Sequence, residues 1–134
     1  MNSKDLANSI TELIFNKKGY DVKILELRDI TSIADYFVIC SADSDTQVKA
    51  IADEVDKKLR DEGIKSWHTE GYRSLNWVLI DFVDVVVHVF KKESREYYNL
   101  EKLWGDAPVV DVTDPLLSKP VKRKPGRPKK IKTE

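Results

Sequence analysis

The sequence predicts an α/β domain in which a mixed sheet of about five strands carries helices packed mainly on one side. Two observations lead to this prediction. Apolar residues at helical spacing alternate along the chain with short runs that are either continuously apolar or alternately apolar and polar, as strands are. The order helix, strand, strand, helix, strand, strand, strand, helix favours one layered sheet over separate all-helical and all-strand domains.

The N-terminal segment is predicted to be a helix followed by a strand. Residues 3–18 have apolar residues at helical spacing, and Gly19 follows as a natural end. Residues 20–27 alternate as a strand does, so successive side chains point to opposite faces. One face of this strand would carry Val22 and Ile24, and the other Leu25 and Leu27.

A central strand and a second helix are predicted next. Residues 36–41 form a short, mainly apolar run, which is typical of a strand buried on both faces. The helix is expected to begin at the capping residues 43–45 and to end near Glu62, before Gly63. Its apolar stripe consists of Val48, Ile51, Ala52, Val55 and Leu59.

The second half of the domain is predicted to contain three strands and a helix. Residues 65–70 are a weak strand candidate, and residues 77–81 and 85–90 are two strands close enough to form a hairpin. Residues 93–104 follow as one helix, and prolines are expected to break regular structure beyond it. The predicted apolar stripe of this helix consists of Tyr97, Leu100 and Trp104.

Charge divides the chain into an acidic domain, residues 1–117, and a basic tail, residues 118–134. The tail has eight Lys/Arg and one Glu (+7), whereas the domain has 15 Lys/Arg and 22 Asp/Glu (−7). The tail has almost no apolar residues and is expected to be disordered when free. An acidic domain favours basic partners and a basic tail favours phosphate backbones, although the two could also attract each other.

Composition argues against membrane and secretory classes. No apolar run approaches the roughly 18 residues that a membrane span needs. The N-terminus lacks the basic-then-apolar order of a secretory signal, and its early acidic residues are unlike a transit peptide, so the bacterial cytoplasm is the expected location. Cys40 is the single cysteine, which excludes an intramolecular disulfide, and we interpret it as a small buried apolar residue.

The predicted hairpin carries the first candidate binding residues. Strand periodicity places Trp77, Leu79 and Asp81 on one face. The matching face of the partner strand carries Val86, His88 and Phe90. The opposite, purely aliphatic faces should lie under helices, which leaves the mixed face as the less covered side and a candidate binding surface. The alternative is that Trp77 is ordinary core and that Asp81 simply ends its strand.

Histidine and cysteine give little indication of catalysis or of a metal site. A lone His in an apolar strand, as His88 is, is more often a hydrogen-bonded core residue than a ligand or base. His68 lies on another predicted strand, and no spacing gathers enough ligands for a metal. A nucleophilic pair of Cys40 with either His has no supporting motif. No catalytic residue, metal or cofactor is therefore predicted.

The acidic run at residues 43–45 invites a comparison with nucleotidyltransferases. Those folds also have a strand, a Ser-containing turn and a helix, with carboxylates that gather Mg²⁺ around a triphosphate. Here Asp43 and Asp45 occupy positions where acidic residues cap a helix, and no glycine-rich phosphate loop accompanies them. Capping is the better interpretation, and an enzyme of this class is the weaker alternative.

The tail contains the segment VKRKPGRPKKIK at residues 121–132, whose Pro-Gly-Arg-Pro core resembles an AT-hook. Such segments place Arg in the narrow minor groove of A·T-rich DNA. The more general interpretation is a polycation that binds the phosphates of any nucleic acid, with RNA favoured. The alternative function is a DNA-associated protein that acts through this tail. The candidate nucleic-acid-binding residues are Lys122, Arg123, Lys124, Arg127, Lys129 and Lys130.

Five segments together resemble the ribosomal silencing factor family, also called Iojap-related. The resemblance extends over roughly residues 3–107, and the basic tail lies outside it. The segments are ADYFVICS at 34–41, QVKAIA at 47–52, WVLID at 77–81, DVVVHVF at 84–90 and REYYNLEKLW at 95–104.

The resemblance implies a nucleotidyltransferase-like fold without a catalytic site, hence no enzymatic activity. It also implies binding to the large ribosomal subunit at large-subunit ribosomal protein fourteen. Binding there would block joining of the small subunit and repress translation when nutrients are scarce, and self-association as dimers is implied as well. The binding residues carried over by position are Trp77, Asp81 and Tyr98, with Leu79, His88, Glu101 and Lys102 as weaker candidates.

One position in the hairpin departs from the family pattern. The family usually has glycine where this chain has Val83. A β-branched residue disfavours positive φ, so a different turn type is expected here.

Overall fold

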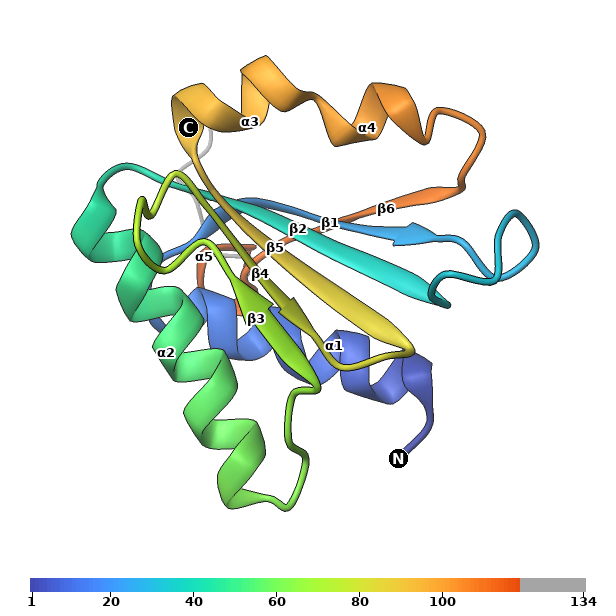
Figure 1. Cartoon of the computed structure of the whole chain (residues 1–134), viewed down its shortest axis with the longest axis horizontal. Coiled ribbons are helices and arrows are strands. Elements are labelled where there is room, and N and C mark those ends of the chain that lie inside the picture. The colour runs from blue at the N-terminus through green and yellow to red at the C-terminus, as the bar shows by residue number, and fades with distance from the viewer. Residues whose placement is uncertain (119–134) are drawn as a thin grey trace, which may run out of the picture.

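The computed structural model describes residues 1–118, in which six strands form one mixed sheet with helices on both faces (Figure 1). The helices are α1 (Ser3–Asn16), α2 (Asp45–Asp61), α3 (Lys92–Tyr98), α4 (Leu100–Leu103) and α5 (Pro115–Ser118). The strands are β1 (Tyr20–Glu26), β2 (Tyr36–Ala42), β3 (His68–Glu70), β4 (Trp77–Asp81), β5 (Val85–Lys91) and β6 (Val109–Val112). The predicted α/β class with a mixed sheet is confirmed, with one strand more than expected.

The strand order is β3-β4-β5-β2-β1-β6, and only the central β2–β5 pair is parallel. All seven residues of β2 are buried, as the apolar run had predicted. The hairpin of β4 and β5 is also confirmed, with Trp77 opposite Phe90 and Leu79 opposite His88. Because residues that face each other across antiparallel strands share a side of the sheet, this register places the candidate binding residues together on one face.

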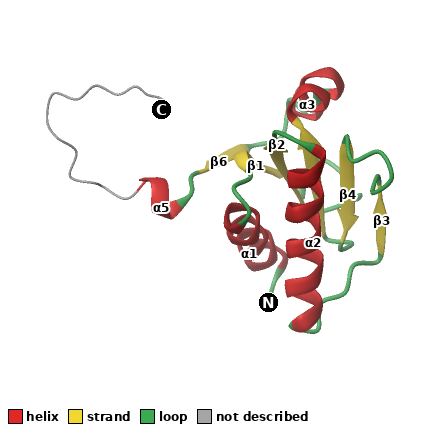
Figure 2. Ribbon diagram, turned by 90° about the vertical axis from the view of Figure 1, so that its left-hand side faces the viewer, coloured by secondary structure: helices red, strands yellow, loops and turns green. Residues whose placement is uncertain are grey.

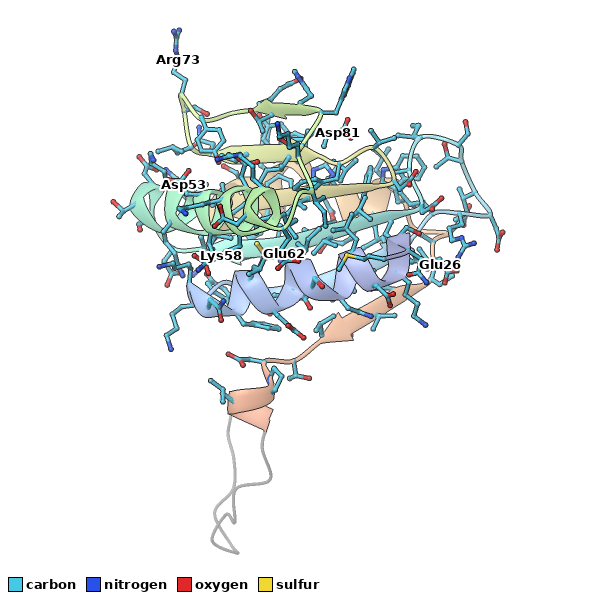
Figure 3. All side chains as sticks on the ribbon, turned by 90° about the horizontal axis from the view of Figure 1, so that it is seen from below. Glu26, Asp53, Lys58, Glu62, Arg73 and Asp81 are labelled. Atoms are coloured by element: carbon cyan, nitrogen blue, oxygen red, sulfur yellow. The ribbon has the colours of Figure 1, made fainter. Side chains whose placement is uncertain are left out.

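The face of the sheet under α1 and α2, called here the α1/α2 face, is mainly aliphatic. The predicted stripe of α2 is confirmed, since each of its five residues is at most 1% exposed. It packs on the aliphatic sides of β4 and β5, among them Val78, Ile80 and Val87. Figure 3 shows charged side chains of the α2 region, Asp53, Lys58 and Glu62, on this side of the molecule. Helix α2 is therefore amphipathic, with its apolar stripe on the sheet and its charged residues toward solvent, as its sequence pattern indicates.

The opposite face is covered in part by α3 and α4 (Figure 1) and is called here the α3/α4 face. Figure 2 shows α3 on the other side of the molecule from α1. Leu100 and Ala107 pack there on Leu25, Phe37 and other sheet residues, with Trp104 against them. The expectation that the helices lie mainly on one side was therefore wrong for the C-terminal helices. Strand periodicity alone explains why both faces need cover, since β1 and β2 carry large apolar residues on each side.

The acidic run does mark the start of α2, but its capping residue is Ser44 and neither aspartate is the N-cap. Ser44 is the N-cap of α2, and its hydroxyl accepts a hydrogen bond from the Gln47 backbone N–H. Asp43 accepts from the Tyr20 hydroxyl, and Asp45 forms an ion pair with Lys91. The two carboxylates are thus engaged in holding the start of α2 against β1 and β5.

The predicted single helix at residues 93–104 is in fact two helices. Asn99 adopts a left-handed conformation (φ 46°), ends α3, and caps α4 by accepting from the Lys102 N–H. Asparagine tolerates this conformation better than most residues. The break explains why the predicted stripe was wrong at Tyr97, which is 82% exposed while Leu100 is buried.

Strand β6 was not predicted, because Pro108 and Pro115 were expected to interrupt regular structure. Pro108 lies just before β6, and its carbonyl accepts from the Glu26 N–H. Since β6 is an edge strand, a proline at its start removes no needed donor. None of the helices in residues 1–118 combines the length and apolar composition that crossing a membrane requires.

Candidate functional site

Three predicted residues of β4 line the part of the α3/α4 face nearest the sheet edge. Trp77, Leu79 and Asp81 alternate with buried residues and are each partly exposed. Tyr98, from the end of α3, is 49% exposed and contacts Trp77, with ring centroids 4.8 Å apart. We call these four residues the Trp77 surface. The tip of the loop before β4, at Arg73, and Asp81 at the end of β4 are both labelled in Figure 3.

Trp77 is held by aromatic neighbours on several sides. Its ring stacks on Phe90 at 4.8 Å, and the Tyr98 ring packs on it at the same separation. Aromatic pairs at such distances add stabilisation beyond the area they bury. Trp77 is neither an ordinary core residue nor a purely exposed binding residue. It packs against the core residues of the α3/α4 face and still keeps part of its surface in solvent.

Gly71 fixes the approach of the preceding loop to Trp77. A Cβ at Gly71 would lie 1.9 Å from the Trp77 carbonyl oxygen, and the backbone there has φ +94°. Both facts require glycine, since any side chain would collide with the β4 backbone in a conformation that L-residues rarely adopt. The loop therefore packs directly on the strand that presents Trp77.

His88 is a buried, hydrogen-bonded residue, as the alternative to a ligand role had predicted. It is 3% exposed, and its Nδ1 accepts from Trp77 Nε1 at 3.1 Å. Burial lowers its pKa to about 3, so the ring is neutral at neutral pH. His88 also packs edge-on against Phe37 at 4.5 Å. The prediction that His88 lies on the binding surface is therefore corrected, because the side chain is buried beneath Trp77.

Asp81 organises the turn between β4 and β5. Its Oδ1 accepts from the Val83 N–H at 2.7 Å, and the Asp84 N–H bonds to the Phe82 carbonyl two residues earlier. This is a γ-turn with Val83 at its centre, where φ is +75°. The expectation that Val83 would avoid positive φ was wrong, whereas a difference in turn type from relatives with glycine here stays a prediction. The valine adopts the conformation usual for glycine, in a turn supported by Asp81.

Glu101 and Lys102 lie elsewhere on the α3/α4 face. Glu101 accepts two hydrogen bonds from Arg95, at 3.0 and 2.6 Å. Arg95 is only 9% exposed and also donates to the Asp21 carbonyl and the Ser41 hydroxyl. This arrangement ties α3 and α4 to β1 and β2 and is distinct from the Trp77 surface. Lys102 is exposed on α4.

Arg95 lines one side of an open polar pocket of about 500 Å³. Its lining combines three cationic with three acidic side chains, so it carries no strong net charge. Because Arg95 is engaged by internal partners, the pocket wall is primarily structural. The lining residues are Asp21, Lys23, Ser41, Lys92, Arg95, Glu96, Asn99 and Glu101.

Three exposed apolar side chains were not predicted as candidates. Trp67 is 74% exposed, Tyr97 82% and Leu103 72%. Tyr97 packs against Tyr98 and so adjoins the Trp77 surface, whereas the Trp67 backbone N–H bonds to the Asp81 carbonyl and the Trp67 ring lies near His68. Helical periodicity had assigned Tyr97 to the core, and the break at Asn99 gave no clear signal in the sequence.

The other candidate chemistries are not assembled in the described residues. Cys40 is fully buried on the α1/α2 face, whereas His88 lies on the α3/α4 face, so they form no nucleophilic pair. Burial raises the pKa of the Cys40 thiol to about 12. No group of three or more His, Cys, Asp or Glu within residues 1–118 is arranged to hold a metal ion. The tail candidates, Lys122 through Lys130, lie outside the described residues.

Comparison with known proteins adds evidence that the geometry alone does not contain. The profile of a family described as "Ribosomal silencing factor during starvation" matches residues 1–134. Ribosomal silencing factor RsfS of Halalkalibacterium halodurans is 47% identical over 112 residues, which is 84% of this chain and 96% of that protein. The chloroplastic protein Iojap of Zea mays is 33% identical over 110 residues, covering 80% of this chain and 45% of that protein.

A solved structure shares the fold. The crystal structure of a protein from Chromobacterium violaceum matches with a TM-score of 0.76 and 37% identity. The match covers 78% of this chain and 88% of that one. At this identity the likeness reflects common descent as well as common architecture.

Proposed function

This chain belongs to the ribosomal silencing factor (RsfS) family, and on that premise we propose that it represses translation by binding the large ribosomal subunit. The proposed contact is large-subunit ribosomal protein fourteen, and the bound domain would sterically block the small subunit when nutrients are limiting. The proposed mode of action is binding rather than catalysis, in the bacterial cytoplasm, by a chain that can self-associate as dimers.

The observation that carries this proposal is the Trp77 surface. A large aromatic residue that is preorganised by its neighbours and still partly exposed has the features of an interface hot spot. Leu79 and Tyr98 add apolar area beside it, and Asp81 adds a charge at the end of the same strand, about 13 Å from Trp77. Lys102 is exposed elsewhere on the same face, while His88 and Glu101 are engaged by Trp77 and Arg95 within the domain.

Charge supports the choice of a basic protein as partner. Residues 1–117 carry a net charge of −7. Ribosomal proteins are typically basic, so an acidic domain is attracted to them over a distance of about one Debye length, roughly 8–10 Å at physiological salt. Electrostatic attraction of this kind mainly accelerates association, whereas the aromatic contact would limit dissociation.

The test is co-sedimentation of the full chain with isolated large and small subunits, together with an assay of subunit joining. Trp77→Ala is expected to cost about 2 kcal/mol of affinity, roughly a thirtyfold weakening. Val110→Ala is the matched control, because Val110 is 56% exposed on β6 at the opposite edge of the sheet. Unchanged subunit joining at saturating wild-type protein would exclude the proposed function.

The basic tail is proposed to add a salt-dependent grip on ribosomal RNA. Its eight Lys/Arg would release counterions from phosphates, and its link to the domain raises its effective concentration at the subunit. A version ending at Leu117 should bind the large subunit more weakly at low salt but with unchanged subunit preference. If only the full chain bound, and bound both subunits alike, the tail rather than the Trp77 surface would carry binding.

A further inference from the structure

We propose that His88 is a positioning residue, which orients the indole of Trp77 for the ribosomal partner by accepting its N–H from beneath. The inference rests on the proposed function, because it assumes that Trp77 contacts the large subunit. Because His88 is buried, it cannot contact the partner directly. The proposal therefore gives it an indirect role in binding.

The hydrogen bond determines the protonation state of the ring. Trp77 Nε1 can only donate, so His88 Nδ1 must be the acceptor and the neutral ring must carry its proton on Nε2. Nε2 is buried and is the single buried side-chain nitrogen or oxygen atom in the described residues without a partner. The described structure thus uses one nitrogen of this histidine and leaves the other unpaired.

An unpaired buried N–H destabilises a fold, and an apolar residue of similar size would avoid that cost. The ring also packs among Phe37, Trp77 and Phe90. Aromatic packing of this kind does not require a polar atom. What the nitrogen adds, in the described residues, is the acceptor for Trp77. Its polarity therefore serves the orientation of Trp77 rather than the stability of the domain.

Orientation matters because an aromatic anchor that rotates freely must be ordered when it binds. His88 fixes the indole plane from below, Phe90 stacks on it and Tyr98 packs at its side. Together these contacts hold one side-chain conformation before the partner arrives. Releasing one of them is expected to weaken binding about three- to tenfold, which corresponds to one immobilised side chain.

Two variants of His88 separate positioning from packing. His88→Leu removes both ring nitrogens, so it removes the acceptor for Trp77 and also the unpaired N–H. His88→Asn keeps an acceptor, because its side-chain oxygen is as many bonds from the backbone as Nδ1 is. Asn is smaller and buries an amide, so this variant should be the less stable of the two.

The measurements are made on the full chain. Exchange of the Trp77 indole N–H with solvent is followed by NMR in the free protein, and stability is followed by urea unfolding. Affinity for isolated large subunits is calculated from the concentration of folded protein in each sample, so that a loss of stability is not counted as a loss of affinity. His88→Leu should unfold at the same or higher urea concentration, exchange the indole proton faster, and bind three- to tenfold more weakly. His88→Asn should lose stability but recover slow exchange and most of the affinity.

Other outcomes overturn the proposal in distinguishable ways. Wild-type affinity in His88→Leu, with the indole proton released, would show that the orientation of Trp77 does not matter for binding. A parallel loss of stability and affinity in both variants would show that His88 acts by packing alone. If Trp77→Ala bound as well as wild type, the proposed function of the Trp77 surface would fail, while indole exchange would still test the hydrogen bond.

Discussion

The α1/α2 face and the α3/α4 face of one sheet differ in the kinds of side chain they carry and in how fully these are covered. On the α1/α2 face, strands and helices meet through aliphatic side chains that are almost completely buried, and Cys40 lies among them. On the α3/α4 face, aromatic and polar side chains are mixed with apolar ones, and short helices leave β4 partly open. The adjacent residues Leu79 and Ile80 belong to different faces.

This difference shows how a small domain can separate stability from recognition. A mainly aliphatic layer gives close packing with few polar groups to satisfy. A face used for recognition must keep apolar area in solvent and orient it, and the hydrogen bond from Trp77 to His88 is the contact that we propose for this purpose. The alternation of a strand makes the separation possible, because each residue is committed to one face or the other.

The largest effect should come from paired substitutions on β4. Ile80→Ala opens a cavity under α2, where Ile80 is fully buried, and should cost about 3 kcal/mol of stability. Leu79→Ala removes a partly exposed side chain and should cost about 1 kcal/mol, yet it should weaken binding to the large subunit. Urea unfolding and co-sedimentation measure the two effects. Equal losses of affinity for the folded variants would show that the faces are not functionally separate.

Acid should weaken the α3/α4 face through His88. Its folded pKa of about 3 lies below the ordinary value of 6.5, so the unfolded state binds the proton more readily as pH falls below 6.5. The contribution of neutral His88 to the free energy of unfolding is fully present above pH 6.5 and is lost as pH falls toward 3. The free energy of unfolding should drop by roughly 2 kcal/mol between pH 7 and pH 5. Unfolding by urea at a series of pH values should therefore show a shallower loss in His88→Leu. An identical pH profile in both proteins would contradict this assignment.

The smallest predicted effect is a change in stability on substitution of Val83, in the turn between the two hairpin strands. Val83 is 56% exposed and holds φ +75°, which is strained for a β-branched residue. Val83→Gly removes that strain but gives the unfolded chain more freedom, so the net gain should be about 0.5–1 kcal/mol. Thermal unfolding measures the gain, and a lower midpoint in the glycine variant would argue against strain at this turn. Binding should change little if Asp81 keeps its place.

Much of the fold was predictable from periodicity. The stripe of α2, the buried run of β2 and the two faces of β1 and β4 all follow from residue spacing within one element. That Trp77, Leu79 and Asp81 share a strand face was predictable in the same way, whereas their role in binding stays a prediction. These predictions succeeded because the side chains of one regular element are related by local geometry alone.

The remaining features depend on contacts between distant parts of the chain. Strand β6 exists because residues 109–112 find an edge of β1 to pair with. The break at Asn99 allows Leu100 to reach the sheet, and Arg95 is neutralised by partners from β1, β2 and α4. None of these partners could be identified from local spacing.

The sequence by itself determined the α/β class, the division into an acidic domain and a basic tail, and which residues share each strand face. These properties depend on composition and on the fixed periods of helix and strand. Only the tertiary structure decided that α3 and α4 cover the second face, that Val83 takes a positive φ, and that His88 lies beneath Trp77. Burial and pairing are properties of the assembled layers, because they depend on which elements meet across the sheet.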